Sequence, residues 1–367
     1  MKRILGFSKK NAVLLIAFFA AMITTIIVPP DSQYLGYFDY KTLTCLFCVL
    51  AVVCALKNIN FFYILACKIV RSFKNARMCI LVLVWVTFIG SMLIANDMAL
   101  LTFLPLGYFV LHTTNKEKYM AFTFIMQNIA ANLGGMLTPF GNPQNLYLYS
   151  KFNIPIDEFT MIMLPPFLFA VMLISLCCMI FIKPEPMSFK DEKVELNKSR
   201  AVFLLILFAY SIVIVFNIIP YWTGLIIIPA ALLITDRKAL KSVDYGLLLT
   251  FVCFFIFAGN MARIDVVKEL IGGMLEMNTL LVSALSCQVI SNVPSAILLS
   301  QFTDDYRNLL LGVNIGGVGT LIASLASLIT LKQYTSLCPG KTKKYIAEFS
   351  LFNFGFLFLL NGFCMVF

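Results

Sequence analysis

The chain has 367 residues, of which 60% are hydrophobic and 13% charged, and its mean hydropathy is +0.91. This composition excludes a water-soluble domain and predicts an all-α polytopic membrane protein embedded in a lipid bilayer. The net charge of +10 comes from Lys and Arg in short clusters between apolar stretches, as in cytoplasmic loops, so we expect no nucleic-acid partner.

Eleven cysteines are scattered through the apolar stretches. Cys45 and Cys48 have CxxC spacing, but there is no second such pair, and the single histidine, His112, is remote in sequence. We expect the cysteines to behave as small buried hydrophobic residues and expect no cofactor beyond a coupling ion.

The first ten residues include four basic ones and precede a first apolar span, Ala12–Val28. We interpret this span as a retained helix and expect a cytoplasmic N-terminus. A second span runs from Phe38 to Leu56. The segment Lys57–Arg77 mixes basic and apolar residues, which suits an interfacial helix on the cytoplasmic face. Two crossings therefore return the chain to the cytoplasm.

The next two apolar runs meet at Asn96-Asp97 and end at Leu111. They are either two full crossings or a re-entrant hairpin, 78–111, that enters from the cytoplasm. We favour the hairpin because the run from Met98 to Leu111 has about fourteen residues, which is short for a span.

A broken helix is expected at 119–150, where Asn132-Leu-Gly-Gly-Met-Leu-Thr138 is followed directly by Pro139-Phe-Gly-Asn-Pro-Gln-Asn145. Glycine, proline and amides at bilayer depth indicate unwound backbone, which is tolerated only inside protein or beside a polar cavity. The span 159–182 then ends the first half of the chain, residues 1–182, and a cytoplasmic linker, 183–200, follows.

The second half, residues 201–367, repeats this plan after one more crossing. Its elements are the spans Val202–Ile219, Tyr221–Ile234 and Tyr245–Gly259, an external hairpin at 277–303 with its tip at Ser291-Asn-Val-Pro-Ser295, a broken helix at 306–331 and a final span at 346–367. The second broken helix contains Asn314-Ile-Gly-Gly-Val-Gly-Thr320.

Two echoes between the halves indicate an internal duplication. The pattern Asn-x-Gly-Gly-x-x-Thr occurs once in each half, and Phe38-Asp39-Tyr40 is matched by Val243-Asp244-Tyr245. Two spans precede the first hairpin and three the second, so the hairpins enter from opposite faces, as two inverted repeats require. The basic clusters fall inside except at Arg307 and at Arg263 with Lys268. Both exceptions lie beside acids, Asp304 and Asp305 in the first case and Asp265 and Glu269 in the second, which softens the violation without removing it.

Asp97 is the sharpest functional candidate. Of the eighteen acidic residues it alone has long apolar runs on both sides, and carboxylates within the membrane usually mark ion or proton pathways. Asp is also a favoured N-cap, and one residue can serve as both cap and cation ligand.

The amides and glycines near the tips and breaks have two candidate roles each. Asparagine offers oxygen to a hard cation and N–H groups to an anion, but it also forms hydrogen bonds between helices. Glycine pairs permit close backbone approach to a ligand or close helix packing. Because no Lys or Arg lies deep in a span, helix N-termini, amides and a co-bound cation would have to balance an anion.

These motifs resemble the ion transporter superfamily, which includes divalent anion–sodium symporters, arsenite permeases, citrate–metal transporters and one class of sodium/proton antiporters. The resemblance rests on the basic interfacial helix, Ala95-Asn96-Asp97, Thr138–Asn145 and Ser291–Pro294. It implies that each hairpin tip forms a cation site with the broken helix behind it. In the dicarboxylate branch each tip carries Ser-Asn-Thr, and both tips here depart from that pattern.

The candidate site residues follow from the two tips and the two broken helices. Those expected to contact substrate are Asn96, Asp97, Asn142, Pro143, Asn145, Ser291, Asn292, Ser295 and Thr320. Those expected to form Na⁺ sites are Asn96, Asp97, Asn132, Gly135, Thr138, Gly141, Asn292, Asn314, Gly317 and Ser324.

The sequence thus predicts a secondary active transporter of the cell membrane that moves a small inorganic or organic anion with Na⁺ or H⁺ by alternating access. A sodium/proton antiporter or an arsenite-type oxyanion extruder is the alternative within the superfamily. An intramembrane enzyme is a further alternative, but this sequence has neither an HExxH pair nor a second buried aspartate to share a proton. A channel is another alternative, and saturable, cation-coupled flux would exclude it. Superfamily members are often dimers, which leaves a homodimer open.

Overall fold

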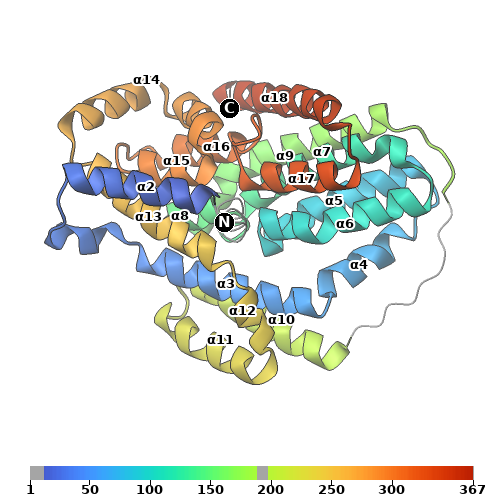
Figure 1. The fold of residues 1–367 in the computed structure, drawn as a ribbon, viewed down its shortest axis with the longest axis horizontal. Coiled ribbons are helices and arrows are strands. Elements are labelled where there is room, and N and C mark those ends of the chain that lie inside the picture. Colours follow the sequence, from blue (N-terminus) through green and yellow to red (C-terminus); the bar gives the residue numbers. More distant parts are fainter. Residues whose placement is uncertain (1–11, 188–196, 367) are drawn as a thin grey trace.

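The computed structural model describes residues 12–187 and 197–366, and these are almost entirely helical (Figure 1). The basic N-terminal residues and most of the expected linker lie outside the described ranges. Within those ranges, six helices are long and apolar enough to cross a membrane: α3 (Tyr40–Asn58), α5 (Ala76–Ile94), α9 (Ile156–Phe181), α10 (Lys198–Val215), α14 (Asp265–Ile290) and α18 (Thr342–Val366). The predicted all-helical polytopic membrane fold is confirmed.

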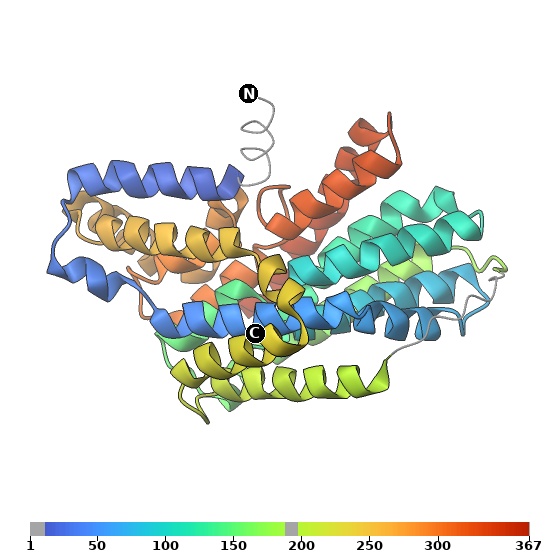
Figure 2. The ribbon, with the colours of Figure 1, turned by 60° about the horizontal axis from the view of Figure 1, so that its bottom comes forward.

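One group of helices, which we call the flanking layer, contains α2 (Ala12–Ile27), α3, α10, α11 (Trp222–Thr235), α12 (Arg237–Ser242) and α13 (Tyr245–Met261). Figure 2 shows α2, α13, α3 and α10 following one another from top to bottom. In this layer, helices of one half of the chain pack against helices of the other half: α2 packs on α13, and α11 packs on α3.

The central helices of the flanking layer begin with the same cap. Asp39 accepts a hydrogen bond from the backbone N–H of Thr42 at 2.9 Å, and Asp244 accepts one from that of Leu247 at 2.9 Å. A short 3₁₀ turn, η1 (Ser32–Tyr37), leads into α3. The repeated Asp-Tyr pair therefore marks the start of α3 and of α13.

Two connecting segments lead from the flanking layer to the hairpins. The first is α4 (Phe61–Val70), followed by Asn75, which caps α5. The second is the early part of α14, which kinks at Asn278, where φ and ψ are −168° and 95°. The side chain of Asn278 accepts from the N–H of Leu281 at 2.9 Å, so it caps the later part of α14 as a separate helix.

The two hairpins turn on one residue each. Ala95 joins α5 to α6 (Asn96–Thr113) with φ 63° and ψ 150°, and Ser291 joins α14 to α15 (Asn292–Leu299) with φ 75° and ψ 158°. A non-glycine residue in this conformation costs about 1–3 kcal/mol, so surrounding contacts must hold both turns. The second limb of the first hairpin has 18 residues; the estimate of about fourteen was wrong because Asn96 and Asp97 at the start and His112 and Thr113 at the end also belong to the helix.

Behind each hairpin lies an interrupted helix. The first consists of α7 (Met120–Gly134), the 3₁₀ turn η3 (Gly135–Leu137) and α8 (Pro143–Lys151), entered through η2 (Glu117–Tyr119). The second consists of α16 (Tyr306–Ile315) and α17 (Leu325–Leu337). α7 packs on α5 and α6, and α16 packs on α14 and α15. We call these elements, with α9 and α18, the hairpin bundle.

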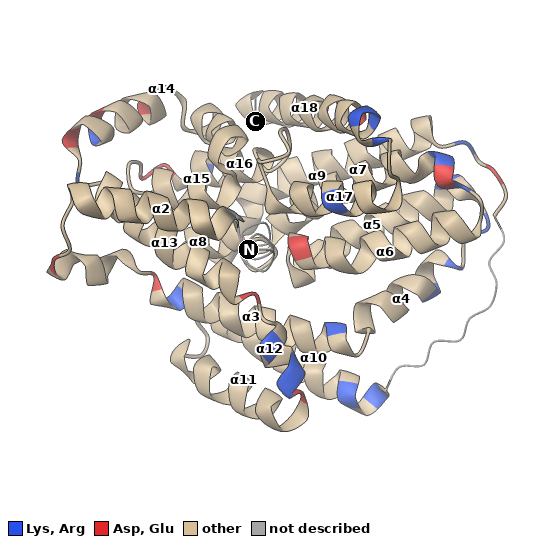
Figure 3. Cartoon of the chain, in the orientation of Figure 1, with Lys and Arg blue, Asp and Glu red and all other residues tan. Residues whose placement is uncertain are grey.

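Charged residues gather at the helix ends and connecting segments (Figure 3). At one such place Lys116 and Lys118 lie 2.7 and 2.5 Å from the carboxylate of Glu185. At another, Arg263 pairs with Asp31 at 2.7 Å and donates to the Tyr37 hydroxyl at 3.1 Å. The fold brings the loop after α2 to the end of α13, so Arg263 pairs with an acid that is distant in sequence.

Candidate functional site

The tip asparagines make the same local contact in both hairpins. Asn96 Oδ1 accepts from the N–H of Asp97, and Asn292 Oδ1 accepts from the N–H of Val293, each at 2.9 Å. Their oxygens thus hold the first turns of α6 and α15, and their amide nitrogens extend to the broken helices. Asn96 Nδ2 donates to Asn132 Oδ1 at 3.2 Å, and Asn292 Nδ2 lies 3.1 Å from where a Cβ on Gly317 would be.

The unwound segments are tied to the hairpins by their threonines. Thr138 Oγ1 donates to the carbonyl of Met92 at 2.7 Å, and Thr320 Oγ1 donates to that of Gln288 at 3.0 Å. Met92 and Gln288 each precede the tip asparagine by four residues. The two copies of Asn-x-Gly-Gly-x-x-Thr therefore hold equivalent places behind the two hairpins.

The glycines of this motif allow the helices to meet closely. A Cβ on Gly134 would collide with the backbone carbonyl of Phe88 on α5, and one on Gly316 would lie 2.8 Å from the Cys287 side chain on α14. A Cβ on Gly135 would collide with Asn142 Oδ1, and one on Gly141 with the carbonyl of Gly135. Packing fully accounts for Gly134 and Gly316, while Gly135 and Gly141 bring backbone carbonyls beside a buried amide.

The two broken helices meet at a buried cluster of amides. Asn132 Oδ1 accepts from Ser324 Oγ at 2.7 Å, and Asn142 Nδ2 donates to Asn314 Oδ1 at 3.3 Å. Asn314 Nδ2 donates to Asn145 Oδ1 at 2.6 Å. Because Asn96 also reaches Asn132, this cluster joins the first tip to both breaks, and it lies at the meeting of the two halves of the chain.

Three buried oxygens around this cluster have no hydrogen-bond donor among the described residues: Asp97 Oδ1, Asn142 Oδ1 and Gln144 Oε1. Buried polar atoms are nearly always paired, so unpaired oxygens call for a ligand, an ion or water. Carboxylate and amide oxygens are suitable ligands for a hard cation. Each of these oxygens could accept a cation, and the carboxylate of Asp97 could also bind a proton.

The remaining predicted residues have other positions. Asn145 donates to the carbonyls of Gly135, Met136 and Thr138, at 3.2, 3.2 and 3.3 Å, and so holds the first break together. Pro143 is the first residue of α8. Within the second hairpin, Ser295 Oγ donates to the carbonyl of Ser291 at 2.8 Å. Ser286 Oγ donates to Ser295 Oγ at 2.5 Å.

Sequence reasoning missed several amides that position the site. Gln288 Nε2 donates to the carbonyls of Gly316 and Val318, at 2.9 and 3.1 Å, and its Oε1 accepts from the N–H of Thr320 at 2.8 Å. Asn128 is within hydrogen-bond reach of α17 through Ser327, and Gln127 donates to the carbonyl of Phe103 on α6. The available signal was an amide side chain within an apolar helix.

The sequence is similar to a known protein family and to several membrane proteins. The family model described as a citrate transporter matches residues 5–305. An uncharacterized transporter of Methanocaldococcus jannaschii is 32% identical over 300 residues, which cover 80% of this chain and 81% of that protein. An inner membrane protein of Escherichia coli is 27% identical over 300 residues, or 80% of each chain.

A 46 kDa membrane protein of Mycobacterium leprae is 25% identical over 362 residues, which cover 85% of this chain and 83% of that protein. The family model spans well over half of the sequence, and the matched region contains both hairpins and the first broken helix. The chain belongs to the citrate transporter family and is a multi-pass membrane transporter, not an enzyme.

Proposed function

We propose that this protein is a secondary active transporter that carries a small anion across the cell membrane together with Na⁺ or H⁺. The observation that carries the proposal is Asp97, a carboxylate at the tip of the first hairpin whose Oδ1 is buried with no hydrogen-bond donor among the residues that the structure describes. A carboxylate held at membrane depth in this way is costly unless a cation or a proton neutralises it. Binding of the coupling ion at Asp97 provides that neutralisation.

The anion is bound beside this cation, at the hairpin tips. α6 and α15 both begin at a tip asparagine, and α8 and α17 begin just after the breaks. The N-terminal ends of these helices supply N–H groups and partial positive charge to an anion. The family's description as citrate transporters supports a carboxylate as the substrate class.

The two tips are unequal, which bears on the coupling ion. In the first tip Asp97 follows the asparagine, whereas in the second tip Val293 and Pro294 follow it. The second tip therefore provides neither a carboxylate nor the N–H that proline lacks. We infer one charged cation site, at the first tip, and a neutral second tip.

In this proposal, alternating access results from movement of the hairpin bundle against the flanking layer, and each of these two parts contains elements of both inverted repeats. The repeat is supported by the matched turns at Ala95 and Ser291 and by the matched threonine contacts. The topology also supports it, because an odd number of additional crossings separates the hairpins.

The test measures ion binding directly. We expect Na⁺, replacing K⁺ at constant ionic strength, to raise the thermal stability of the purified protein saturably, and we expect Asp97→Asn to abolish the shift. A ligand at 100 times its dissociation constant stabilises the folded state by about 2.7 kcal/mol, which is measurable. If Na⁺ has no effect at any concentration but the stability difference between wild type and Asp97→Asn changes with pH, the coupling ion is H⁺. If neither effect is found, Asp97 is not an ion site.

A sodium/proton antiporter or an oxyanion extruder is the second candidate, and the carboxylate at Asp97 is the observation that favours it. The antiporter differs from the proposed transporter because it needs no anion, and an oxyanion extruder differs from it in the direction of anion transport. In proteoliposomes loaded with a pH-sensitive dye, an antiporter moves protons on addition of Na⁺ alone, whereas the proposed transporter requires the anion as well.

A further inference from the structure

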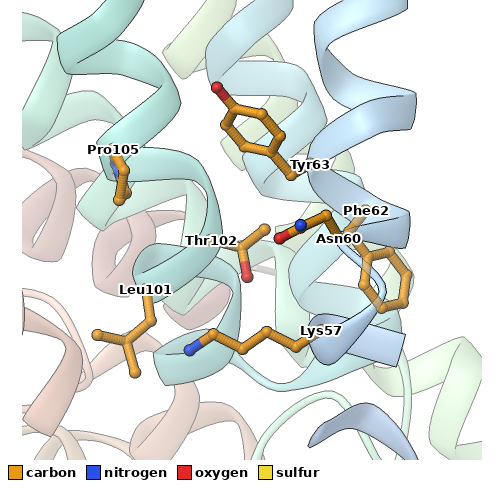
Figure 4. A pocket seen from close by; sticks show the side chains of 7 residues that line it. All are labelled: Lys57, Asn60, Phe62, Tyr63, Leu101, Thr102 and Pro105. Carbon is orange, nitrogen blue, oxygen red and sulfur yellow. The ribbon is translucent and has the colours of Figure 1, made fainter. Parts of the chain in front are cut away.

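A cavity lies between the junction of α3 with α4 and the middle of α6 (Figure 4). It has a volume of about 190 Å³, room for about six water molecules at ~30 Å³ each. One wall is formed by Lys57, Asn60, Phe62 and Tyr63, and the other by Leu101, Thr102 and Pro105. The cavity thus separates a connecting segment of the flanking layer from the second limb of the first hairpin.

The positive charge in this cavity is Lys57. Its side chain extends across the cavity towards Leu101 on α6 (Figure 4). In the part of the chain that the structure describes, the ammonium group makes neither an ion pair nor a hydrogen bond with a side chain. Phe62, Leu101 and Pro105 supply apolar side chains around it.

Other hydrogen-bond donors face the same space. Asn60 precedes α4 in the left-handed conformation, with φ 54° and ψ 27°, and its side chain does not cap the helix. Phe62 and Tyr63, in the first turn of α4, also line the cavity. The Thr102 hydroxyl is already used, since it donates to the carbonyl of Met98 at 2.8 Å.

The α6 wall of the cavity lies on the same helix as the first tip. Asp97, Leu101 and Pro105 are spaced four residues apart on α6, so they share one face of the helix. Four residues rise by about 6 Å. The α6 wall of the cavity therefore begins one helical turn from the carboxylate of Asp97.

We propose that this cavity is an anion-binding vestibule, in which Lys57 captures a small carboxylate before it reaches the hairpin tips. The vestibule supplies the basic side chain that the tips lack. The inference rests on the proposed function in assigning the anion as substrate; the binding site itself stands on the cavity and its cation.

The experiment measures ligand binding in the cavity and does not require transport. Thr102→Cys places a thiol on the cavity wall, and its alkylation by a maleimide is followed at residue 102 by peptide mass spectrometry in lipid-free detergent. We expect citrate to slow this alkylation and chloride at equal ionic strength to leave it unchanged. In the Thr102→Cys background we expect Lys57→Met to weaken the protection about tenfold, because a hydrogen bond to a charged group is worth at least ~1.4 kcal/mol, and Lys57→Arg to retain it.

The matched control is Lys68→Met in the same background, which removes an exposed lysine from the other end of α4. Equal protection by citrate with Lys57→Met and with Lys68→Met would overturn the proposal. So would protection by vesicles of phosphatidylglycerol without any by citrate, which would assign the cavity to a lipid headgroup. Protection that survives Asp97→Asn while transport is lost would support the vestibule and separate it from the function of the tip.

Discussion

Gln288 shows how much of this site depends on one neutral side chain. It satisfies two carbonyls and one N–H of the second break. In the first half, the matching position is Met92, and the carbonyls of the break are satisfied instead by Asn145. The two halves thus support equivalent unwound segments with different amides.

Replacing Gln288 by Leu should be strongly destabilising. The change keeps a similar size but leaves buried backbone groups unpaired, each at a cost of about 1–3 kcal/mol. Met92→Leu, at the matching position, should cost less than about 1.5 kcal/mol. Thermal unfolding of the two purified variants checks this, and equal melting temperatures would show that Gln288 does not support the break.

At the residue scale, the sequence predicted those groups whose chemistry is unusual at membrane depth. The carboxylate of Asp97 and the paired glycines stand out in an apolar stretch, and the structure places them at a tip and behind the hairpins. Gln288 does not stand out, because only the fold shows that unwound backbone lies beside it. Asp31 could not be matched with Arg263, because their contact depends on the packing of α2 against α13.

Among the elements, the hairpins are held against the broken helices by glycine. The sequence places the breaks well because Gly, Pro and Asn interrupt apolar runs there. The expected start of the second hairpin, at 277, also lies one residue before the kink of α14 at Asn278. The length of α6 was underestimated because the polar residues at both of its ends look like loops in the sequence, although they belong to the helix.

Gly134→Ala tests this close packing. The added Cβ would collide with the carbonyl of Phe88, a backbone atom that cannot rotate away. We expect a loss of about 1–3 kcal/mol from overpacking, with weaker cation-dependent stabilisation because the first tip shifts. Gly355→Ala on α18 meets no atom within 4 Å and is the control, expected to be neutral or slightly stabilising. A Gly134→Ala protein as stable as the control would contradict the packing described above.

For the molecule as a whole, distant connections hold the hairpin bundle together. Lys116, Lys118 and the hydroxyl of Tyr119 converge on Glu185, which joins the end of the first hairpin to the segment after α9. These hydrogen bonds lower the pKa of Glu185 from its ordinary value of 4.5 to about 2. The folded protein therefore binds this proton less readily than the unfolded chain does.

This difference predicts a dependence of stability on pH. The contribution of Glu185 is fully present above about pH 4.5 and is lost as the pH falls towards 2. Glu185→Gln should lower the melting temperature at neutral pH and lose less stability than wild type across that acid range. The matched control is Glu348→Gln, which removes a carboxylate that lies 3.6 Å from Lys344 at the start of α18. Parallel pH profiles for wild type and Glu185→Gln would refute the role given to this cluster.

The central claim concerns the coupling of an anion to a cation through Asp97, and uptake into proteoliposomes tests it most directly. We predict that radiolabelled citrate accumulates inside the vesicles only while an inward gradient of Na⁺ or H⁺ is imposed. Asp97→Asn, reconstituted at the same density, should abolish this accumulation. Accumulation that is equally fast without any cation gradient, or that is unchanged in Asp97→Asn, would contradict the account.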